Sequence, residues 1–135
     1  MKPKARTIIE KFGFADDDKK DSTHDQIQLW VFKNFSLVVN SCYRSHYSHD
    51  STPELEHPIT ENKFIVGFVD LYKDGFAIEV KSKIPSIGEL IRQINFYRNY
   101  TGGRWIVVSP DDRYADVLRA QDIQFYKCKA PGELF

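Results

Sequence analysis

The sequence has no apolar run of the roughly 18–20 residues that a transmembrane helix needs. Its first stretch, MKPKARTIIEKF, lacks an apolar core of signal-peptide length and a small-residue cleavage site. We therefore expect no membrane partner, and we expect this stretch to belong to the fold. The chain also has no helicase motif and no Gly-rich phosphate loop, so an ATP-driven partner would have to be another polypeptide.

Cysteine is scarce, and Cys42 and Cys128 have neither a CxxC motif nor His-rich surroundings. This pattern argues against a structural zinc site and for a reducing compartment, so we expect a cytoplasmic location. An excess of charge of either sign is missing too, because 19 Lys and Arg residues balance 19 Asp and Glu residues. Net charge therefore gives no sign of a polyanionic partner.

The distribution of charge says more than its sum. Residues 81–104 hold five basic side chains against Glu89 alone, a net charge of +4, whereas residues 10–25 have a net charge of −3. A basic segment suits a site that handles phosphate groups. A solvated helix face is an equally good interpretation of the same charges.

The 135 residues suit a single domain, 1–135, with an N-terminal helical part at 1–40 and a core at 53–127. Apolar periodicity predicts helices at 3–12, from about His24, from Ser86 to about Tyr100 and at 112–120. Strands are predicted at 54–59, 64–71, 76–81, 105–108 and 123–126, the first at a sheet edge because it contains Pro58. This order indicates an α/β fold with a mixed sheet flanked by helices, in which strands 76–81 and 105–108 are parallel.

Two segments fit both a helix and a strand, and a third is predicted to be a loop. Residues 27–31 alternate like a strand as well as following a helical period, and the apolar run 35–39 fits either type. Residues 41–52 contain Tyr43, His46, Tyr47 and His49 among serines, and we expect them to form an exposed loop.

Asp70, Glu79 and Lys81 are charged residues within otherwise apolar predicted strands. Glu79 and Lys81 are two positions apart, so both side chains leave the same face of their strand. The short turn at residues 73–75 joins this strand to that of Asp70 and brings the three side chains together. Neighbouring carboxylates repel unless a cation lies between them, and hard oxygen ligands suit Mg²⁺. The pattern therefore predicts a metal-dependent phosphodiesterase centre, in which Lys81 orients the attacking water.

A simpler interpretation is that Glu79 and Lys81 line a solvated sheet face and pair with each other, because an isolated ExK tripeptide is common. The surrounding pattern favours the metal centre. Gly67 precedes Asp70, a helix follows Lys81, and a fully apolar strand follows that helix.

Gly67-x-x-Asp70, Glu79-Val80-Lys81 and Gln93-x-x-x-Tyr97, in this order, resemble the motifs of the restriction-endonuclease-like PD-(D/E)XK nuclease superfamily. The closer match is to its RecB-type branch, which includes bacterial recombination nucleases and CRISPR-adaptation nucleases. The resemblance covers residues 64–108, a third of the chain, and implies an αβββαβ nuclease core. Val69 stands in place of the proline of the family name, as it often does in that branch.

The resemblance implies that Asp70 and Glu79, helped by the Val80 carbonyl, bind Mg²⁺ or Mn²⁺, and that Lys81 is the catalytic lysine. It implies that Gln93 and Tyr97 brace the site or touch the substrate backbone, and their spacing puts both on one helix face. Without the resemblance, Tyr97 would be interpreted as core packing and Gln93 as a surface residue. Lys83 and Arg92 of the basic segment are further substrate-binding candidates.

Members of the RecB-type branch often have a further metal ligand on an upstream helix. His24 is the first candidate for it, and Glu10 is the second, because other members use a glutamate there. A capping-region histidine on an acidic surface is the other interpretation of His24. Relatives with an iron–sulfur cluster need four cysteines, so we expect no cluster in this chain.

Three functional hypotheses follow. The first is a Mg²⁺- or Mn²⁺-dependent deoxyribonuclease that hydrolyses phosphodiester bonds, with DNA favoured over RNA. The second is a nuclease-fold module that binds nucleic acid or a protein partner and cuts nothing. The third is a structure-selective endonuclease such as a junction resolvase, acting as a homodimer.

Overall fold

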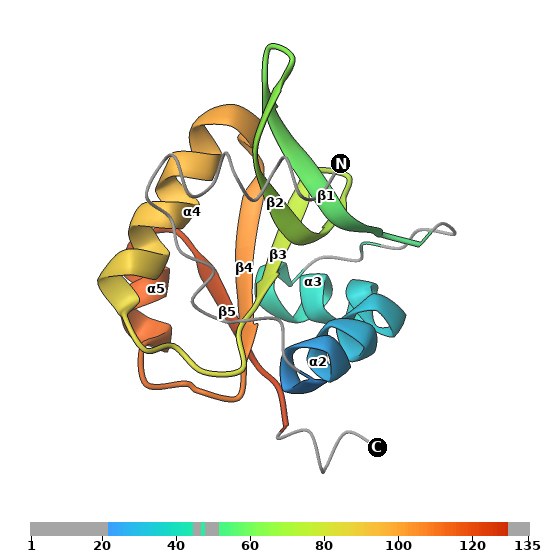
Figure 1. The fold of residues 1–135 in the computed structure, drawn as a ribbon. Helices are drawn as coiled ribbons and strands as arrows, with labels where there is room; N and C mark the ends of the chain where they lie inside the picture. The colour runs from blue at the N-terminus through green and yellow to red at the C-terminus, as the bar shows by residue number, and fades with distance from the viewer. Residues whose placement is uncertain (1–21, 45–46, 48–51, 130–135) are drawn as a thin grey trace.

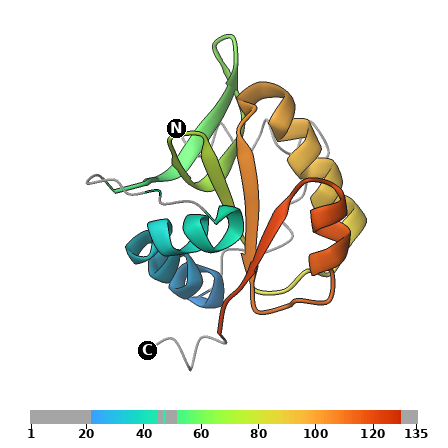
Figure 2. The same ribbon diagram turned by 180° about the vertical axis from the view of Figure 1, so that it is seen from behind.

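The computed structural model describes residues 22–44, 47 and 52–129. In chain order the elements are α2 (Ser22–Lys33), α3 (Phe35–Tyr43), β1 (Glu54–Glu61), β2 (Phe64–Lys73), β3 (Phe76–Val80), α4 (Ile87–Thr101), β4 (Arg104–Ser109), α5 (Ala115–Ala120) and β5 (Gln124–Lys127). Helices cover both faces of one five-stranded sheet (Figures 1 and 2), which confirms the α/β class expected from the sequence. The helix predicted at 3–12 and the candidate ligand Glu10 lie outside the described residues.

The sheet is mixed, with the strand order β1-β2-β3-β4-β5. The first three strands are antiparallel neighbours, and β3, β4 and β5 are parallel. The turn between β2 and β3 uses Asp74 and Gly75 with φ of 51° and 83°, a geometry that suits a tight hairpin connection. β1 forms one edge and contains Pro58, as predicted, and α4 is the crossover between parallel β3 and β4.

Helices α2 and α3 cover one face of the sheet (Figure 1). Ile27 and Val31 of α2 are fully buried against apolar residues of β3 and β4, including Ile78 and Ile106. A strand would turn Ile27, Leu29 and Val31 to the same face, but Leu29 is exposed while the other two are buried. Residues 27–31 are therefore helical, because one face of a helix buries Ile27 and Val31 and leaves Leu29 outside.

The prediction of an exposed loop at 41–52 is wrong for its first residues. Residues 41–43 are the last turn of α3, which ends at Arg44 in a left-handed conformation with φ of 49°. Tyr43 and Tyr47 are partly buried, and both rings lie against Phe76 with centroids 5.6 and 5.1 Å away. Burial of aromatic surface on β3 outweighs the polar, serine-rich character of the segment. His46 and His49 lie outside the described residues.

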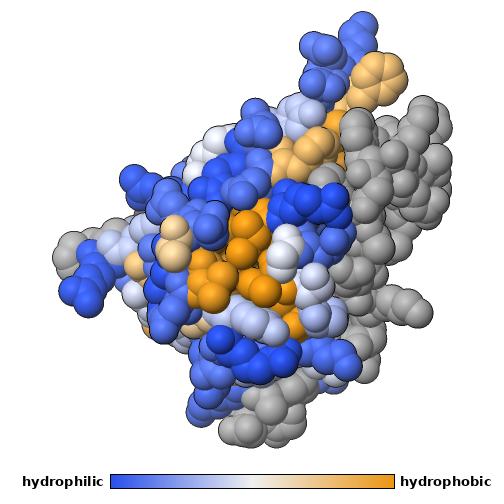
Figure 3. All heavy atoms as spheres, turned by 90° about the vertical axis from the view of Figure 1, so that its left-hand side faces the viewer, coloured by the Kyte–Doolittle hydropathy of each residue, from blue (hydrophilic) through white to orange (hydrophobic). Residues whose placement is uncertain are grey.

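Helices α4 and α5 cover the other face. Ser86 caps α4 by accepting a hydrogen bond from the Glu89 main-chain N–H at 3.2 Å, and Gly102 ends the helix with φ of 59°. Leu90, Ile94 and Tyr97 are its buried face. Figure 3 looks onto this side of the molecule, where apolar side chains gather at the centre and hydrophilic ones surround them.

Within the described ranges, every helix is too short or too polar to span a lipid bilayer.

Candidate functional site

At Asp70 the regular pairing of β2 with β3 has stopped, although β2 remains paired with β1. The β2–β3 pairing runs from Lys73 with Phe76 as far as Leu71 with Ile78. The next main-chain N–H of β3 that points to β2, that of Val80, donates to the Asp70 side chain instead, at 2.8 Å from Oδ2. The carboxylate thus takes the place of a strand carbonyl. A charged side chain is held rigidly at the point where two central strands part.

His24, on helix α2 beside the sheet, contacts this carboxylate of β2. Its Nε2 lies 3.3 Å from Asp70 Oδ2, and both side chains are almost completely buried, with 1% and 3% of their surface exposed. The other ring nitrogen, Nδ1, lies 3.3 Å from Oδ1 of the exposed Asp25. The histidine and the aspartate singled out from the sequence, 46 residues apart, therefore meet in space.

Glu79 and Lys81 are also buried, each with 8% exposure. Strand alternation puts them on the same face as Ala77, which packs in the cluster beneath α4, whereas Ile78 and Val80 pack beneath α2 and α3. The interpretation of Glu79 and Lys81 as a pair on a solvated sheet face is therefore wrong. The sheet continues through Lys81, whose main-chain N–H donates to the Val108 carbonyl at 2.9 Å.

Gly67 and Tyr97 are in direct contact. A Cβ atom on Gly67 would lie 2.5 Å from three atoms of the Tyr97 side chain, closer than atoms can approach, so the ring packs on the bare backbone. Tyr97 is 1% exposed, and its hydroxyl is 3.3 Å from Gln93 Nε2. The contact explains physically why a glycine precedes Asp70 by three residues, and it couples two of the sequence motifs.

The other two substrate-binding candidates are on the surface. Lys83 is exposed in the segment between β3 and α4. Arg92 lies on the outer side of α4 and forms an ion pair with Glu89 at 2.6 Å. The basic segment is therefore split between the buried Lys81 and exposed cations.

The segment after Lys81 is held by residues that sequence reasoning missed. Asp111 Oδ2 accepts the Ile84 N–H at 2.9 Å, and Arg113 donates to the Ile84 carbonyl at 3.1 Å. Arg113 also binds both oxygens of Asp111 at 2.8 Å. Hydrogen bonds from Arg113 and from the main chain hold the pKa of Asp111 well below its usual range. The spacing of Asp111 and Arg113 carries no signal for this clasp, because its partner lies 27 residues away.

Gln28 and Glu56 were missed as well, and they adjoin Asp70. Gln28 Nε2 donates to the Asp70 main-chain carbonyl at 3.1 Å and to Glu56 Oε2 at 3.0 Å. On β1 the pairs Leu55–Leu71 and His57–Val69 bracket Glu56, which therefore stands opposite Asp70. Glu56 has a left-handed backbone with φ of 52°, a conformation that is costly for a residue with a side chain.

The donor atoms around Asp70 suit a small divalent cation. With a proton on Nδ1 alone, facing Asp25, the His24 Nε2 lone pair stands beside a carboxylate oxygen, and these are two metal-binding atoms. With both nitrogens protonated, the imidazolium instead bridges two carboxylates. Among the described residues no three His, Cys, Asp or Glu side chains form a ready-made metal group. The His24–Asp70 pair is therefore the preformed part of the expected site.

The two cysteines differ from Asp70 in the groups that surround their ionisable atoms. Cys42 and Cys128 carry free thiols. Burial raises the pKa of each thiol to about 11, because no partner stabilises the thiolate enough to offset desolvation. At Asp70, by contrast, an N–H group and an imidazole both face the carboxylate.

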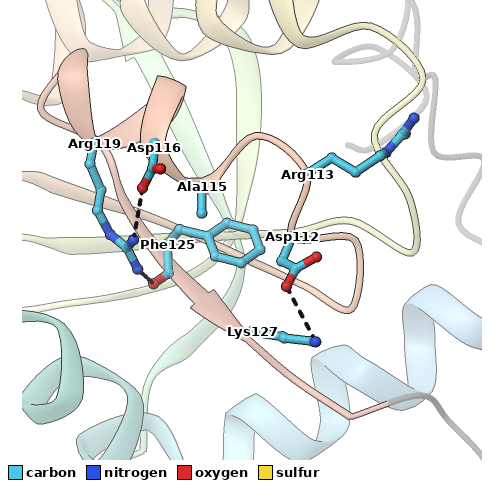
Figure 4. A pocket seen from close by; sticks show the side chains of 7 residues that line it. All are labelled: Asp112, Arg113, Ala115, Asp116, Arg119, Phe125 and Lys127. Atoms are coloured by element: carbon cyan, nitrogen blue, oxygen red, sulfur yellow. Dashed lines mark hydrogen bonds and ion pairs between the residues drawn. The ribbon is translucent and has the colours of Figure 1, made fainter.

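A separate hollow of about 310 Å³ lies between α5 and β5 (Figure 4). Its lining includes two ion pairs, Lys127–Asp112 at 3.2 Å and Arg119–Asp116 at 3.6 Å, with Phe125 between them. Its charged groups are already paired, Arg113 with Asp111 outside the lining, and it contains none of the site residues predicted from the sequence.

No family model, no curated protein and no solved structure matches this chain.

Proposed function

We propose that this protein is a Mg²⁺- or Mn²⁺-dependent nuclease with a restriction-endonuclease-like core of the PD-(D/E)XK type. The element order α2 and α3, β1 to β3, α4 and β4 agrees with an αβββαβ core, and β3 is parallel to β4 through the α4 crossover. Agreement of this order is support at the level of fold, and the function rests on the site.

The observation that carries the proposal is the buried contact between His24 Nε2 and Asp70 Oδ2 at 3.3 Å. Two metal-binding side chains from different layers of the fold meet at the point where β2 and β3 part. Glu79 is the neighbour of Val80, whose N–H binds the same Asp70 carboxylate. We propose that His24, Asp70 and Glu79, with the Val80 carbonyl, hold the metal.

A divalent metal bound there would act as a Lewis acid toward the scissile phosphate and lower the pKa of a bound water. Lys81 stands on the same strand face as Glu79 and is buried, so its ammonium group is shielded from bulk water. Its role is to orient the attacking water or to hold a non-bridging phosphate oxygen. Gln93 and Tyr97 brace the β2 side of the site through the contact of Tyr97 with Gly67.

Cleavage assays test this function. Purified protein is incubated with single- and double-stranded DNA and with RNA, in Mn²⁺ or Mg²⁺ and with EDTA as the metal-free condition. We expect metal-dependent cleavage of DNA, and a loss of at least about 100-fold in Asp70→Asn, because several kcal/mol of transition-state stabilisation leave with the metal.

The matched control is Asp116→Asn, since Asp116 is fully exposed on α5 and should be replaceable without loss. Cleavage that survives in Asp70→Asn, or that persists in EDTA, contradicts the proposal. Mn²⁺ binding to the wild-type protein without any cleavage would favour the binding module instead.

A further inference from the structure

Asp70 is contacted both by the neighbouring strand β3 and by a side chain of α2. The regular pairs of β2 with β3 end at Leu71, and the β1–β2 pairs Leu55–Leu71 and His57–Val69 flank Glu56 and Asp70. At Asp70 the carboxylate accepts the Val80 N–H, and the main-chain carbonyl accepts a hydrogen bond from Gln28.

Gln28 is suited to this task by its place on α2. It is four residues after His24, so both side chains leave the same face of the helix. His24 faces the Asp70 carboxylate and Gln28 faces the Asp70 carbonyl. One helix face therefore sets both the side chain and the main chain of a single residue.

Glu56 anchors the amide of Gln28. An amide nitrogen has two hydrogen atoms, and here one goes to Glu56 Oε2 at 3.0 Å and the other to the Asp70 carbonyl at 3.1 Å. Because Glu56 Oε2 can only accept, the side-chain amide of Gln28 must turn its nitrogen toward Glu56 and the Asp70 carbonyl. Glu56 also has a left-handed backbone with φ of 52°, a local conformational cost at the residue that accepts from Gln28.

We propose that Gln28 is a positioning residue for Asp70, oriented by Glu56, and that it sets the metal affinity of the site without touching the metal. The inference rests on the proposed metal-dependent function. Groups that orient a metal ligand in this way typically contribute 10–100-fold to metal affinity or activity.

The variants separate the two hydrogen bonds of Gln28. Gln28→Glu removes both donors and places a second carboxylate beside Glu56. The double variant Gln28→Glu/Glu56→Gln restores a hydrogen bond between positions 28 and 56, because the new amide on β1 can donate to the new carboxylate on α2. It restores no donor from position 28 for the Asp70 carbonyl. Gln28→Met, which is of similar size and adds no charge, serves if the charged variant does not fold.

Two quantities are measured for each variant: Mn²⁺ affinity by titration calorimetry and the thermal midpoint without metal. We expect Gln28→Glu and Gln28→Met to weaken Mn²⁺ binding by about 10-fold or more. We expect the double variant to recover the thermal midpoint but not the Mn²⁺ affinity. Gln26→Glu, an exposed position on the same helix, is the matched control and should change neither quantity.

Unchanged Mn²⁺ affinity in Gln28→Met overturns the positioning role. Full recovery of Mn²⁺ affinity in the double variant overturns it too, because the hydrogen bond between α2 and β1 would then be enough to maintain metal binding without a donor to the Asp70 carbonyl. Asp70→Asn distinguishes this failure from failure of the proposed function. If Asp70→Asn binds Mn²⁺ as the wild type does, the metal site itself is wrong. If Asp70→Asn abolishes binding while Gln28 variants keep it, only the role of Gln28 is wrong.

Discussion

Two groups of charged residues differ sharply in how the fold treats them. The buried group consists of His24, Asp70, Glu79 and Lys81, each exposing 8% of its surface or less. The surface clasp consists of Asp111 and Arg113, whose side chains are 11% and 62% exposed. The clasp joins opposite charges through two bonds of 2.8 Å and grips the main chain of Ile84, so it has an evident structural purpose.

The buried group also contacts the main chain, because the Asp70 carboxylate accepts the Val80 N–H at 2.8 Å, but its burial is costly. Desolvating charged side chains costs free energy that their mutual attraction seldom recovers, and apolar residues of similar volume would often serve stability as well or better. A fold that nevertheless buries four ionisable side chains on α2 and on or beside its central strands favours a role in chemistry. The comparison teaches that the clasp serves the fold, and we infer that the buried charges are retained for chemistry in addition to the structural contacts they make.

The largest expected effect comes from removing both strand charges of the buried group at once. In Glu79→Gln/Lys81→Met we expect metal-dependent cleavage to fall by at least about 100-fold, because metal binding and water orientation are both lost. We expect the thermal midpoint without metal to stay the same or rise, because two buried charges are replaced by neutral side chains of similar size and their desolvation cost is removed. Cleavage rates and calorimetric melting measure the two effects.

The single variant Lys81→Met is the control for this prediction. It leaves the Glu79 carboxylate buried without its neighbouring cation, and its thermal midpoint should lie below that of the double variant. A double variant that melts lower than Lys81→Met and still cleaves would show that these charges serve stability, as those of the clasp do.

The next effect concerns the contact that ties the strand of the buried group to α4. In Gly67→Ala the new methyl group would lie 2.5 Å from the Tyr97 side chain, so we expect a loss of about 1–3 kcal/mol in the free energy of unfolding. Tyr97→Leu should remove most of this added cost, which a double-mutant cycle in urea denaturation measures.

Gly88→Ala is the matched control, because a Cβ there meets nothing within 4 Å. Gly88 lies in the first turn of α4, where alanine is tolerated at least as well as glycine, so this variant should lose no stability. Equal effects at the two glycines would mean that Tyr97 moves aside freely and does not brace β2.

The smallest expected effect is at the clasp, in acid. The folded-state pKa of Asp111 lies below its unfolded value of about 3.9, so its stabilising contribution is present above pH 4 and is lost as pH falls through the folded-state pKa. We expect Asp111→Asn to lower the thermal midpoint by about 2–4 °C at pH 7, with a difference that shrinks below about pH 4. Melting curves between pH 7 and 2 measure it.

The Mn²⁺ affinity of Asp111→Asn separates the role of the clasp from that of the buried group. Because Asp111 lies outside the buried group, Mn²⁺ affinity in Asp111→Asn should match that of the wild type. A stability difference that grows in acid, or a large loss of Mn²⁺ affinity, would contradict the assignment of the clasp to the fold alone.

Much of the fold could be predicted because the signals for it are local. Apolar periodicity marks α4, the turn residues Asp74 and Gly75 mark the hairpin, and the apolar run at β4 marks a buried parallel strand. The run 35–39 could not be assigned, because a short apolar segment fits a helix or a strand until its packing partners are known.

Part of the candidate site was also within reach of the sequence. Asp70, Glu79 and Lys81 stand out because charge interrupts apolar strands, and Gly67 and Tyr97 because of their motif spacing. Gln28 and Glu56 gave no such signal, because glutamine on a helix and glutamate near a sheet edge are ordinary surface residues.

The sequence by itself determined the order of helices and strands and the three charges set in β2, in β3 and directly after β3, because both are properties of neighbouring residues. Tertiary structure decided that His24 and Gln28 reach the two sides of Asp70 and that Tyr97 closes on Gly67. These contacts join residues 30 to 46 positions apart, and only the packing of α2 and α4 against opposite faces of the sheet sets their distances.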